Sequence, residues 1–303
     1  MKISNSVLFG NGLNRVGESQ LEWTELINKI KAPNEFINGK LPNTFFYERA
    51  LFQKDPLQDI KELEKKIKVY ISDLLKDIKV NKLYQNLLDL NFYNYITTNY
   101  DNIFLNYILK DGKFHSQSSN KESTYSLRRK ESIFENNNKE RCRIWNIHGS
   151  IKRPSSIMLG IDHYCKSVSK IDDYVNGKYE FKGINKTSNK KLTDKIMNVD
   201  FDDYSWVELF FNSNIHIVGF SLDYCEIDLW WIINKRARLL RDNRFKNSLK
   251  NKVYFYDSCI DPEKEGLLKS LNVEVIKTER EDCKDAWMNY YYSVFENIHS
   301  GNF

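Results

Sequence analysis

Short apolar segments alternate with amphipathic segments along most of this chain of 303 residues. The apolar segments are rich in β-branched and aromatic residues, and glycine or a polar residue follows most of them. They cover residues 5–9, 92–98, 142–147, 157–159, 214–218, 253–256 and 273–276. The segments between them repeat apolar residues at helical spacing. This alternation favours a parallel sheet with helices on both faces, so the predicted fold class is α/β and Rossmann-like.

The alternation continues without an internal repeat or a clear linker, and we therefore expect a single domain over residues 1–303. Apolar residues at helical spacing predict a helical insertion over about 33–90. Two stretches rich in serine, asparagine and lysine, about 111–140 and 165–200, are predicted to be polar insertions. The first of them is expected to be an exposed loop or an insertion.

Composition excludes several classes of protein. Hydrophobic residues make up 41% of the chain and charged residues 29%, which excludes collagen-like and largely disordered chains. No apolar run approaches the ~18 residues of a membrane-spanning helix, and the first residues lack the apolar core of a signal peptide, so we expect neither. Five cysteines at irregular spacing favour a reducing compartment, and we expect a cytoplasmic protein.

The net charge of +5 is concentrated in one segment. Residues 234–252 contain eight basic side chains and one acid, Asp242, a local charge of +7, so the remaining residues sum to −2. A solvated helix face and loop is the favoured interpretation. A nucleic-acid surface, a surface for an acidic partner and attraction of an anionic dinucleotide to a cleft are the alternatives.

Ligands of open parallel sheets bind at the carboxyl ends of the strands, and five predicted strands end in glycine-rich, polar or titratable residues. These ends are Gly10-Asn11-Gly12, Thr98-Asn99-Tyr100-Asp101, Asn146-Ile147-His148-Gly149, Gly219-Phe220-Ser221 and Asp257. Glycines after a strand let backbone N–H groups approach a pyrophosphate, although an ordinary tight turn explains them as well. The third glycine of the dinucleotide fingerprint is absent, which disfavours a hydride-transferring Rossmann enzyme.

The side chains at these strand ends also have structural explanations. Asp101 is suited to cap the helix that follows, and Asn99 lies at the same helix start. The pKa of histidine makes His148 the best candidate for a general base in the chain. The segment Asp162-His163-Tyr164 could line the cleft or cap a surface helix. Three further histidines are interpreted as non-catalytic: His115, His216 and His299.

The order of these strand ends resembles that of the sirtuin-like NAD-binding fold. That family has a G-A-G-type first turn, a T-Q-N-I-D segment, an H-G pair and a G-T-S turn. The matching segments, within residues 5–260, are Gly10-Asn11-Gly12, Thr97-Thr98-Asn99-Tyr100-Asp101, His148-Gly149 and Gly219-Phe220-Ser221. The flanking Leu-Phe-Gly-Asn-Gly-Leu-Asn and Ile-Val-Gly-Phe-Ser-Leu look more like divergent bacterial sirtuin-like domains of anti-phage defence systems. Those domains are NAD glycohydrolases that deplete cellular NAD.

The resemblance implies that NAD is the substrate, cleaved to nicotinamide and ADP-ribose, in abortive-infection defence. It implies that Asn99 orients the attacking water or the ribose hydroxyls, that His148 takes the proton, and that Asp101 orders the Asn99 loop and bonds within the nicotinamide pocket. The implied NAD-binding residues are Gly10, Asn11 and Gly12 for phosphate, Gly219 and Ser221 for ribose or phosphate, and Asp257 for the adenosine ribose diol.

Departures from the deacylase sirtuins concern zinc and the first turn. Deacylases hold a zinc ribbon with two Cys-x-x-Cys pairs, which this chain lacks, so no metal is expected. The stretch 33–90 replaces the short cofactor loop of the deacylases, and Leu13-Asn14-Arg15 replaces the segment with the usual small serine. These departures disfavour peptide deacylation.

Other functions stay open beside NAD hydrolysis. They are a non-catalytic NAD- or ADP-ribose-binding or scaffolding subunit of a defence complex, a lysine deacylase and a nucleic-acid-binding protein, the last possible but not favoured. The chain carries no recognisable effector or sensor domain. We therefore expect activation by assembly, as a homo-oligomer or with a separately encoded partner such as an ATPase.

Overall fold

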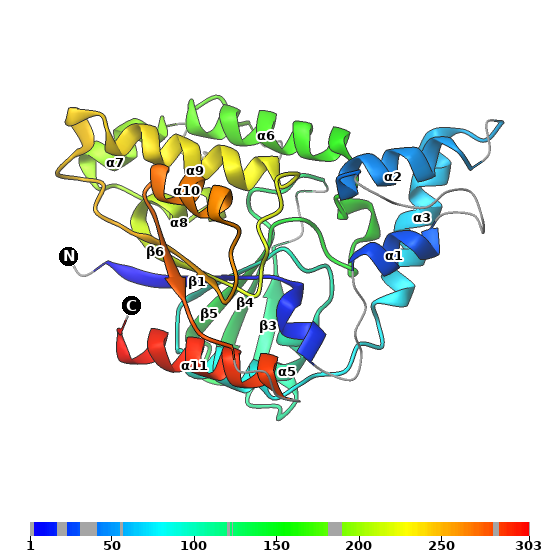
Figure 1. Ribbon diagram of the computed structural model, residues 1–303, viewed down its shortest axis with the longest axis horizontal. Helices are drawn as coiled ribbons and strands as arrows, with labels where there is room; N and C mark the ends of the chain where they lie inside the picture. Colours follow the sequence, from blue (N-terminus) through cyan, green and yellow to red (C-terminus); the bar gives the residue numbers. More distant parts are fainter. Residues whose placement is uncertain are drawn as a thin grey trace.

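The computed structural model places an eight-stranded sheet at the centre of the protein, with helices on both of its faces (Figure 1). The described residues are 3–16, 23–30, 41–54, 57–119, 122, 124–180, 190–280 and 285–302. Within these ranges, no helix combines the length and the apolar run that a membrane crossing requires.

The sheet has the strand order β3-β4-β5-β2-β1-β6-β7-β8 and is mostly parallel. Its strands are β1 (Ser4–Phe9), β2 (Asn94–Thr97), β3 (Phe114–Ser118), β4 (Lys130–Glu135), β5 (Glu140–Asn146), β6 (Ser213–Val218), β7 (Val253–Asp257) and β8 (Val273–Lys277). β1 pairs in parallel with β2 on one side and with β6 on the other. Antiparallel pairing joins β3 to β4 and β4 to β5 at one edge. The predicted α/β, Rossmann-like fold is therefore confirmed.

Alternate residues of β1 face opposite helical layers, as the pleat of a strand requires. One layer contains α6 (Ile161–Val175), α7 (Leu192–Asn198), α8 (Trp206–Asn212) and α9 (Ile227–Leu240); the other contains α4 (Leu83–Asp89), α5 (Ile103–Leu109) and α11 (Ala286–Ser300). Leu8 belongs to the core under the first layer, whereas Val7 and Phe9 belong to the core under the second. Figure 1 shows α6 and α9 on one side of the sheet and α5 and α11 on the other.

The helical insertion divides into two parts. Helices α1 (Trp23–Ile30), α2 (Asn43–Phe52) and α3 (Ile60–Leu74) form a separate apolar cluster beside the sheet (Figure 1). The buried residues of α4 belong instead to the core on the sheet. Residues 31–40, at the predicted start of this insertion, lie outside the described residues. In the described part of the chain, the remaining helical segments are α10 (Pro262–Ser270) and three short 3₁₀ helices, Asn11–Val16, Pro154–Ser156 and Asn243–Phe245.

Residues 111–140 are expected to be an exposed loop or an insertion, and the loop alternative is wrong for much of this stretch. β3 and β4 lie within this stretch and extend the sheet at its antiparallel edge. Polar residues are compatible with β3 because it is the edge strand and its alternate residues are exposed. In β4, the buried Glu131 carboxylate accepts from the Ser118 hydroxyl and pairs with Lys152. The second predicted polar insertion, 165–200, contains most of α6 and all of α7, and residues 181–189 lie outside the described residues.

The strand predicted at 157–159 is absent from the sheet, although these residues are described. Ile157 and Leu159 are buried against α1–α3, and the Met158 N–H donates to the His148 carbonyl. A short apolar run shows only that a segment is buried, and here an irregular segment is buried without strand partners.

Candidate active site

A cavity of about 380 Å³ opens at the carboxyl ends of β1, β2, β6 and β7. The chain passes from β5 on one side of β1 to β6 on the other, and ligands of open α/β sheets bind where the strand order reverses in this way. Eight of the predicted site residues line this cavity: Asn11, Gly12, Asn99, Asp101, His148, Gly219, Ser221 and Asp257. Gly10 is the predicted residue that lies outside the lining.

The two glycine turns, after β1 and after β6, pack directly against each other. The Gly10 N–H donates to the Val218 carbonyl at 3.3 Å, and the Gly12 N–H donates to the Gly219 carbonyl at 2.8 Å. A Cβ atom on Gly12 would lie 2.5 Å from the Tyr291 hydroxyl and 2.6 Å from the Gly219 oxygen, so only glycine permits this approach. Because both N–H groups are bonded within the chain, a phosphate at this turn would take most of its hydrogen bonds from other donors.

Asn99 lies in the turn after β2 and lines the cavity. Its backbone N–H donates to the Thr97 hydroxyl at 3.0 Å, which fixes the turn after β2. Its side-chain Nδ2 atom is buried and has no hydrogen-bond partner among the described residues. A buried amide donor without a partner costs about 1–3 kcal/mol, so this group is suited to bind a ligand or a water molecule.

Asp101 connects the loop after β2 to the turn after β1. Its carboxylate accepts the Ile103 N–H at 3.0 Å and the Asn14 amide at 2.9 Å. The Tyr84 hydroxyl donates in turn to the Asn14 side-chain oxygen. Burial raises the pKa of Asp101, although both hydrogen bonds to its carboxylate oppose this shift. The contacts place Asp101 beneath the Asn99 loop, where it orders the start of α5.

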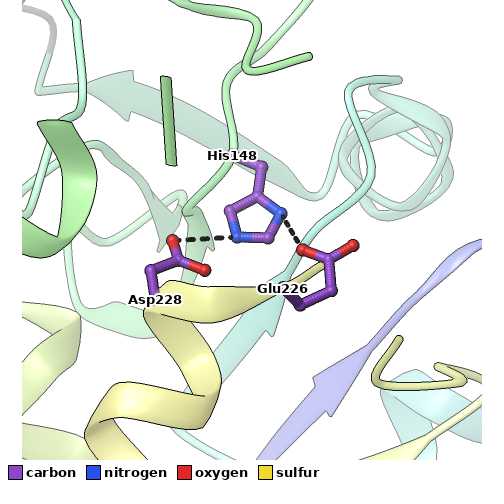
Figure 2. Close-up of side chains that lie close together, drawn as sticks. All are labelled: His148, Glu226 and Asp228. Atoms are coloured by element: carbon purple, nitrogen blue, oxygen red, sulfur yellow. Dashed lines mark ion pairs between the residues drawn. The ribbon is translucent and has the colours of Figure 1, made fainter. Parts of the chain in front are cut away.

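His148 lies just beyond the end of β5, between two carboxylates from the start of α9 (Figure 2). Its Nδ1 atom is 3.5 Å from Oε2 of Glu226, and its Nε2 atom is 3.2 Å from Oδ2 of Asp228. Gly149 makes the sharp turn after the histidine with a φ of +116°, and a Cβ atom there would lie 2.5 Å from the Ser156 carbonyl oxygen. The His-Gly pair therefore has a steric as well as a chemical basis.

The three groups of this cluster shift one another's protonation. Burial by itself would lower the pKa of His148, but the carboxylates of Asp228 and Glu226 outweigh it and raise this pKa above its ordinary value. Burial, together with the nearby Asp228 carboxylate, raises the pKa of Glu226 to about 7, against the opposing effect of His148. Glu226 is thus a cavity-lining carboxyl group that titrates near neutral pH.

These side chains are also close enough together to suggest metal ligands, since one ligand atom from each lies within 4.8 Å of the others in the described part of the chain. The carboxylates, however, face different ring nitrogens, Glu226 at Nδ1 and Asp228 at Nε2 (Figure 2). One metal ion can bind only one of the two nitrogens. The observed arrangement is that of an imidazole held between two acids, and a metal would require the cluster to rearrange.

Neither Glu226 nor Asp228 is a predicted site residue. The pattern Asp223-x-x-Glu226 resembles a capping box at a helix start, and Asp228 lies in the first turn of that helix. Both acids follow β6, whereas His148 follows β5, and nearly 80 residues separate them from it in the chain, so the sequence does not reveal the contact. The signal available in the sequence is their place directly after the Gly219-Phe220-Ser221 turn, at the edge of the sheet where ligands bind.

Further cavity residues come from the 3₁₀ helix after β1, from α11 and from the insertion helices. Arg15 and the aromatic residues Trp287, Tyr290 and Tyr291 of α11 line the end of the cavity nearest Asp257. The insertion helices contribute Leu26, Asn43 and, just after α3, Leu75. Arg15 stands where the sequence departs from the sirtuin first turn, and it brings positive charge to a lining that also holds several carboxylates.

The basic stretch 234–252 lies away from this cavity. Its first part is the last two turns of α9, whose 14 residues span about 21 Å from the end that carries Glu226 and Asp228. Arg236 is buried and donates to the carbonyls of Asn251 and Asn272. No residue of this stretch is among the described residues that line the cavity. The stretch is therefore poorly placed to contact a ligand in the cleft.

Comparison with known proteins adds a family to this geometry. Residues 94–276, more than half of the chain, match the family model described as a SIR2-like domain. The matched range runs from the start of β2 into β8, so it contains Asn99, Asp101, His148 and the two acids of α9, whereas β1 with its glycine turn and α11 lie outside it. No curated protein matches the chain.

Proposed function

The chain belongs to the SIR2-like domain family, and from this premise we propose that it hydrolyses NAD to nicotinamide and ADP-ribose. The family is generally NAD-consuming. The observation that carries the proposal is the convergence of Asn99 and His148, from two different strand ends, on one cavity of about 380 Å³. This volume falls within the roughly 300–1,000 Å³ typical of small-molecule sites.

The proposed reaction needs a positioned water and a proton acceptor. The glycosidic C1′–N bond breaks with its electron pair going to the ring nitrogen, so nicotinamide leaves as a neutral molecule and needs no acid. A water oxygen bonds to C1′ and loses one proton. A site for this chemistry therefore requires a group that orients the water, for which Asn99 Nδ2 is suited, and a base on the His148 side of the cavity.

The other parts of NAD have candidate partners in the same cavity. In this proposal Asp257 accepts from the adenosine ribose diol, and Ser221 contacts the second ribose or a phosphate. Arg15 contacts the pyrophosphate together with Asn11, because the Gly10 and Gly12 N–H groups are bonded within the chain. Asp101 keeps the Asn99 loop in place through its contacts to Ile103 and Asn14. No step of this scheme uses a metal.

We further propose that the activity serves anti-phage defence and is switched on by assembly or by a partner. Motif likeness to defence domains supports the first part. Exposed apolar side chains on and beside the insertion helices, Phe45, Phe52 and Leu57, support the second. Phage plating on bacteria that express the protein or its His148→Ala variant tests the defence role, and light scattering with and without NAD tests assembly.

The central experiment measures nicotinamide release from NAD by the purified protein, alone and with co-purifying partners. Asn99→Ala and His148→Ala should each lower kcat by about 10²–10⁴-fold, the usual contribution of a positioning or acid–base group, with the fold intact by circular dichroism. Two variants with full turnover would refute the site assignment. Tight calorimetric binding of NAD without nicotinamide release under any of these conditions would instead identify a non-catalytic NAD-binding subunit.

A further inference from the structure

The position of His148 between two carboxylates raises the question of which group accepts the proton. A nitrogen lone pair that faces a carboxylate oxygen is repelled by it, whereas an N–H in the same place is attracted. Since Glu226 lies at Nδ1 and Asp228 at Nε2 (Figure 2), the facing carboxylates favour a proton on both ring nitrogens. An imidazolium has no lone pair left to accept a proton from water.

The three side chains differ in their access to the cavity. Asp228 is fully buried and does not line the cavity, and the His148 side chain is only 2% exposed. Glu226 lines the cavity and keeps 16% of its side-chain surface exposed. Of the three, Glu226 is the group that a bound water molecule can reach most easily.

The partners of Asp228 show a different task for that residue. Its carboxylate accepts from the Ser167 hydroxyl of α6 at 3.0 Å and from the Leu229 N–H at 2.9 Å. These bonds fix the carboxylate against Nε2 of His148 and hold it away from the cavity. Asp228 therefore orients the ring and stabilises its positive charge, as the buried acid of a hydrolase triad does.

On the basis of the proposed NAD hydrolysis, we infer that Glu226 is the proton acceptor of this site. His148, as an imidazolium, positions the Glu226 carboxylate, and Asp228 in turn positions His148. In the step, the water oxygen bonds to C1′, the C1′–N electron pair goes to nicotinamide, and the water proton goes to the Glu226 carboxylate. That proton is then released to solvent. The family resemblance predicts His148 as the proton acceptor, whereas the contacts of the three side chains favour Glu226.

The protonation of Glu226 suits a base that works near neutral pH. Its pKa of about 7 means that a large fraction is ionised at pH 7 while it retains strong affinity for a proton. The titratable groups that face Glu226 are His148 from the end of β5, Asp223 and Asp228 from the segment that starts α9, Tyr164 from α6, and Tyr100 and Cys225 from the adjoining loops.

The first test compares the pH dependence of NAD hydrolysis by the wild type and by Glu226→Gln from about pH 5 to pH 9. The wild-type kcat/KM should rise through an inflection near 7, as Glu226 loses its proton. Glu226→Gln should lower kcat by about 10²–10⁴-fold and abolish the inflection, while Glu226→Asp keeps an inflection. Glu64→Gln, which alters a glutamate beside another buried histidine, is the matched control and should keep the inflection. A Glu226→Gln variant with the inflection and near-wild-type kcat would overturn the inference.

The second test does not depend on turnover. Nitrogen-15 NMR of the His148 ring, assigned by comparison with His148→Gln, should show both nitrogens protonated at pH 7 in the wild type. Asp228→Asn should lower the pKa of the ring. A neutral His148 ring at pH 7 in the wild type would overturn the inference even if NAD is hydrolysed. A wild type that releases no nicotinamide under any partner condition would refute the proposed function instead, and the ring titration would then settle the protonation of this cluster separately.

Discussion

Two histidines on neighbouring elements, His148 and His163, are almost equally buried and are held in opposite ways. His163, in the first turn of α6, accepts two backbone N–H groups at Nδ1, those of Leu159 and Gly160, each at 3.0 Å. Nδ1 therefore carries no proton, and the tautomer is fixed with Nε2–H toward the Glu64 carboxylate. His148 faces carboxylates at both nitrogens and can carry a proton on each. Burial alone does not distinguish a structural histidine from a reactive one, whereas the partners of its two nitrogens do.

The glutamates beside these histidines are shifted in opposite directions. The hydrogen bond from His163, with Lys68 also nearby, lowers the pKa of Glu64 to about 2. Glu226 shares its histidine with a second carboxylate, and burial raises its pKa to about 7. A glutamate with two donors and no competing acid stays ionised and fastens α3 to α6. A glutamate that is buried beside another acid keeps its proton up to neutral pH, which suits proton transfer.

The largest effect expected from this comparison is a loss of stability, without loss of turnover, in His163→Leu. The substitution leaves the N–H groups of Leu159 and Gly160 without their acceptor and removes one of the two donors to the Glu64 carboxylate. We therefore expect the free energy of unfolding to fall by about 3 kcal/mol. Urea denaturation measures this change. NAD turnover per folded molecule should stay within about threefold of the wild type.

The control for this variant is His115→Leu, since His115 is exposed on the edge strand β3 and should change stability by less than about 1 kcal/mol. Equal losses from both variants, or a His163→Leu protein that folds normally and has no turnover, would contradict the structural role of His163.

A smaller effect is expected from Glu64→Gln, and it should depend on pH. Glu64 has a folded-state pKa of about 2, below the ordinary value of 4.5, so its ionised form stabilises the fold. This stabilisation is fully present above about pH 4.5 and is lost as the pH falls toward 2. At pH 7 the variant should be less stable by about 1.5–3 kcal/mol, the range for hydrogen bonds to charged groups.

Urea denaturation of the wild type and Glu64→Gln between about pH 4 and pH 7 measures the difference. The gap should be constant near neutral pH and should begin to close at the acid end. A gap that widens on acidification has the wrong sign and would show that Glu64 is not held ionised by His163 and Lys68.

The smallest effect is expected from Ser167→Ala. Ser167 connects the surroundings of His163 with those of His148. Ser167 lies one turn after His163 on α6, and its hydroxyl donates to Asp228, behind His148. Its loss should cost about 0.5–1.5 kcal/mol of stability and lower NAD turnover by no more than about fivefold, because the Leu229 N–H still holds Asp228. If turnover falls further in Ser167→Ala than in Asp228→Asn, then Ser167 affects catalysis through a contact other than its hydrogen bond to Asp228.

Much of the fold could be predicted because a short apolar segment indicates by its composition that it is buried. Six of the seven predicted strands are strands of the sheet, and the failure at 157–159 is an apolar run that is buried as irregular chain. The sequence did not predict β3, because an edge strand with alternate exposed residues resembles a loop in composition. It did not predict β4, because three of the six residues of that strand are charged. Local sequence thus specifies burial better than it specifies pairing.

The candidate site, too, has one part that the sequence predicts and one part that it does not. The sequence alone shows strands that alternate with helices and end in glycine or polar residues. Because parallel strands end on the same side of a sheet, this pattern is enough to place Asn99, His148 and Ser221 at one edge. Only the tertiary structure placed the two acids of α9 on either side of His148, although nearly 80 residues separate them in the chain. The protonation of a buried group depends on charges a few ångströms away and on the water that the fold excludes, and neither is written in the residues next to it.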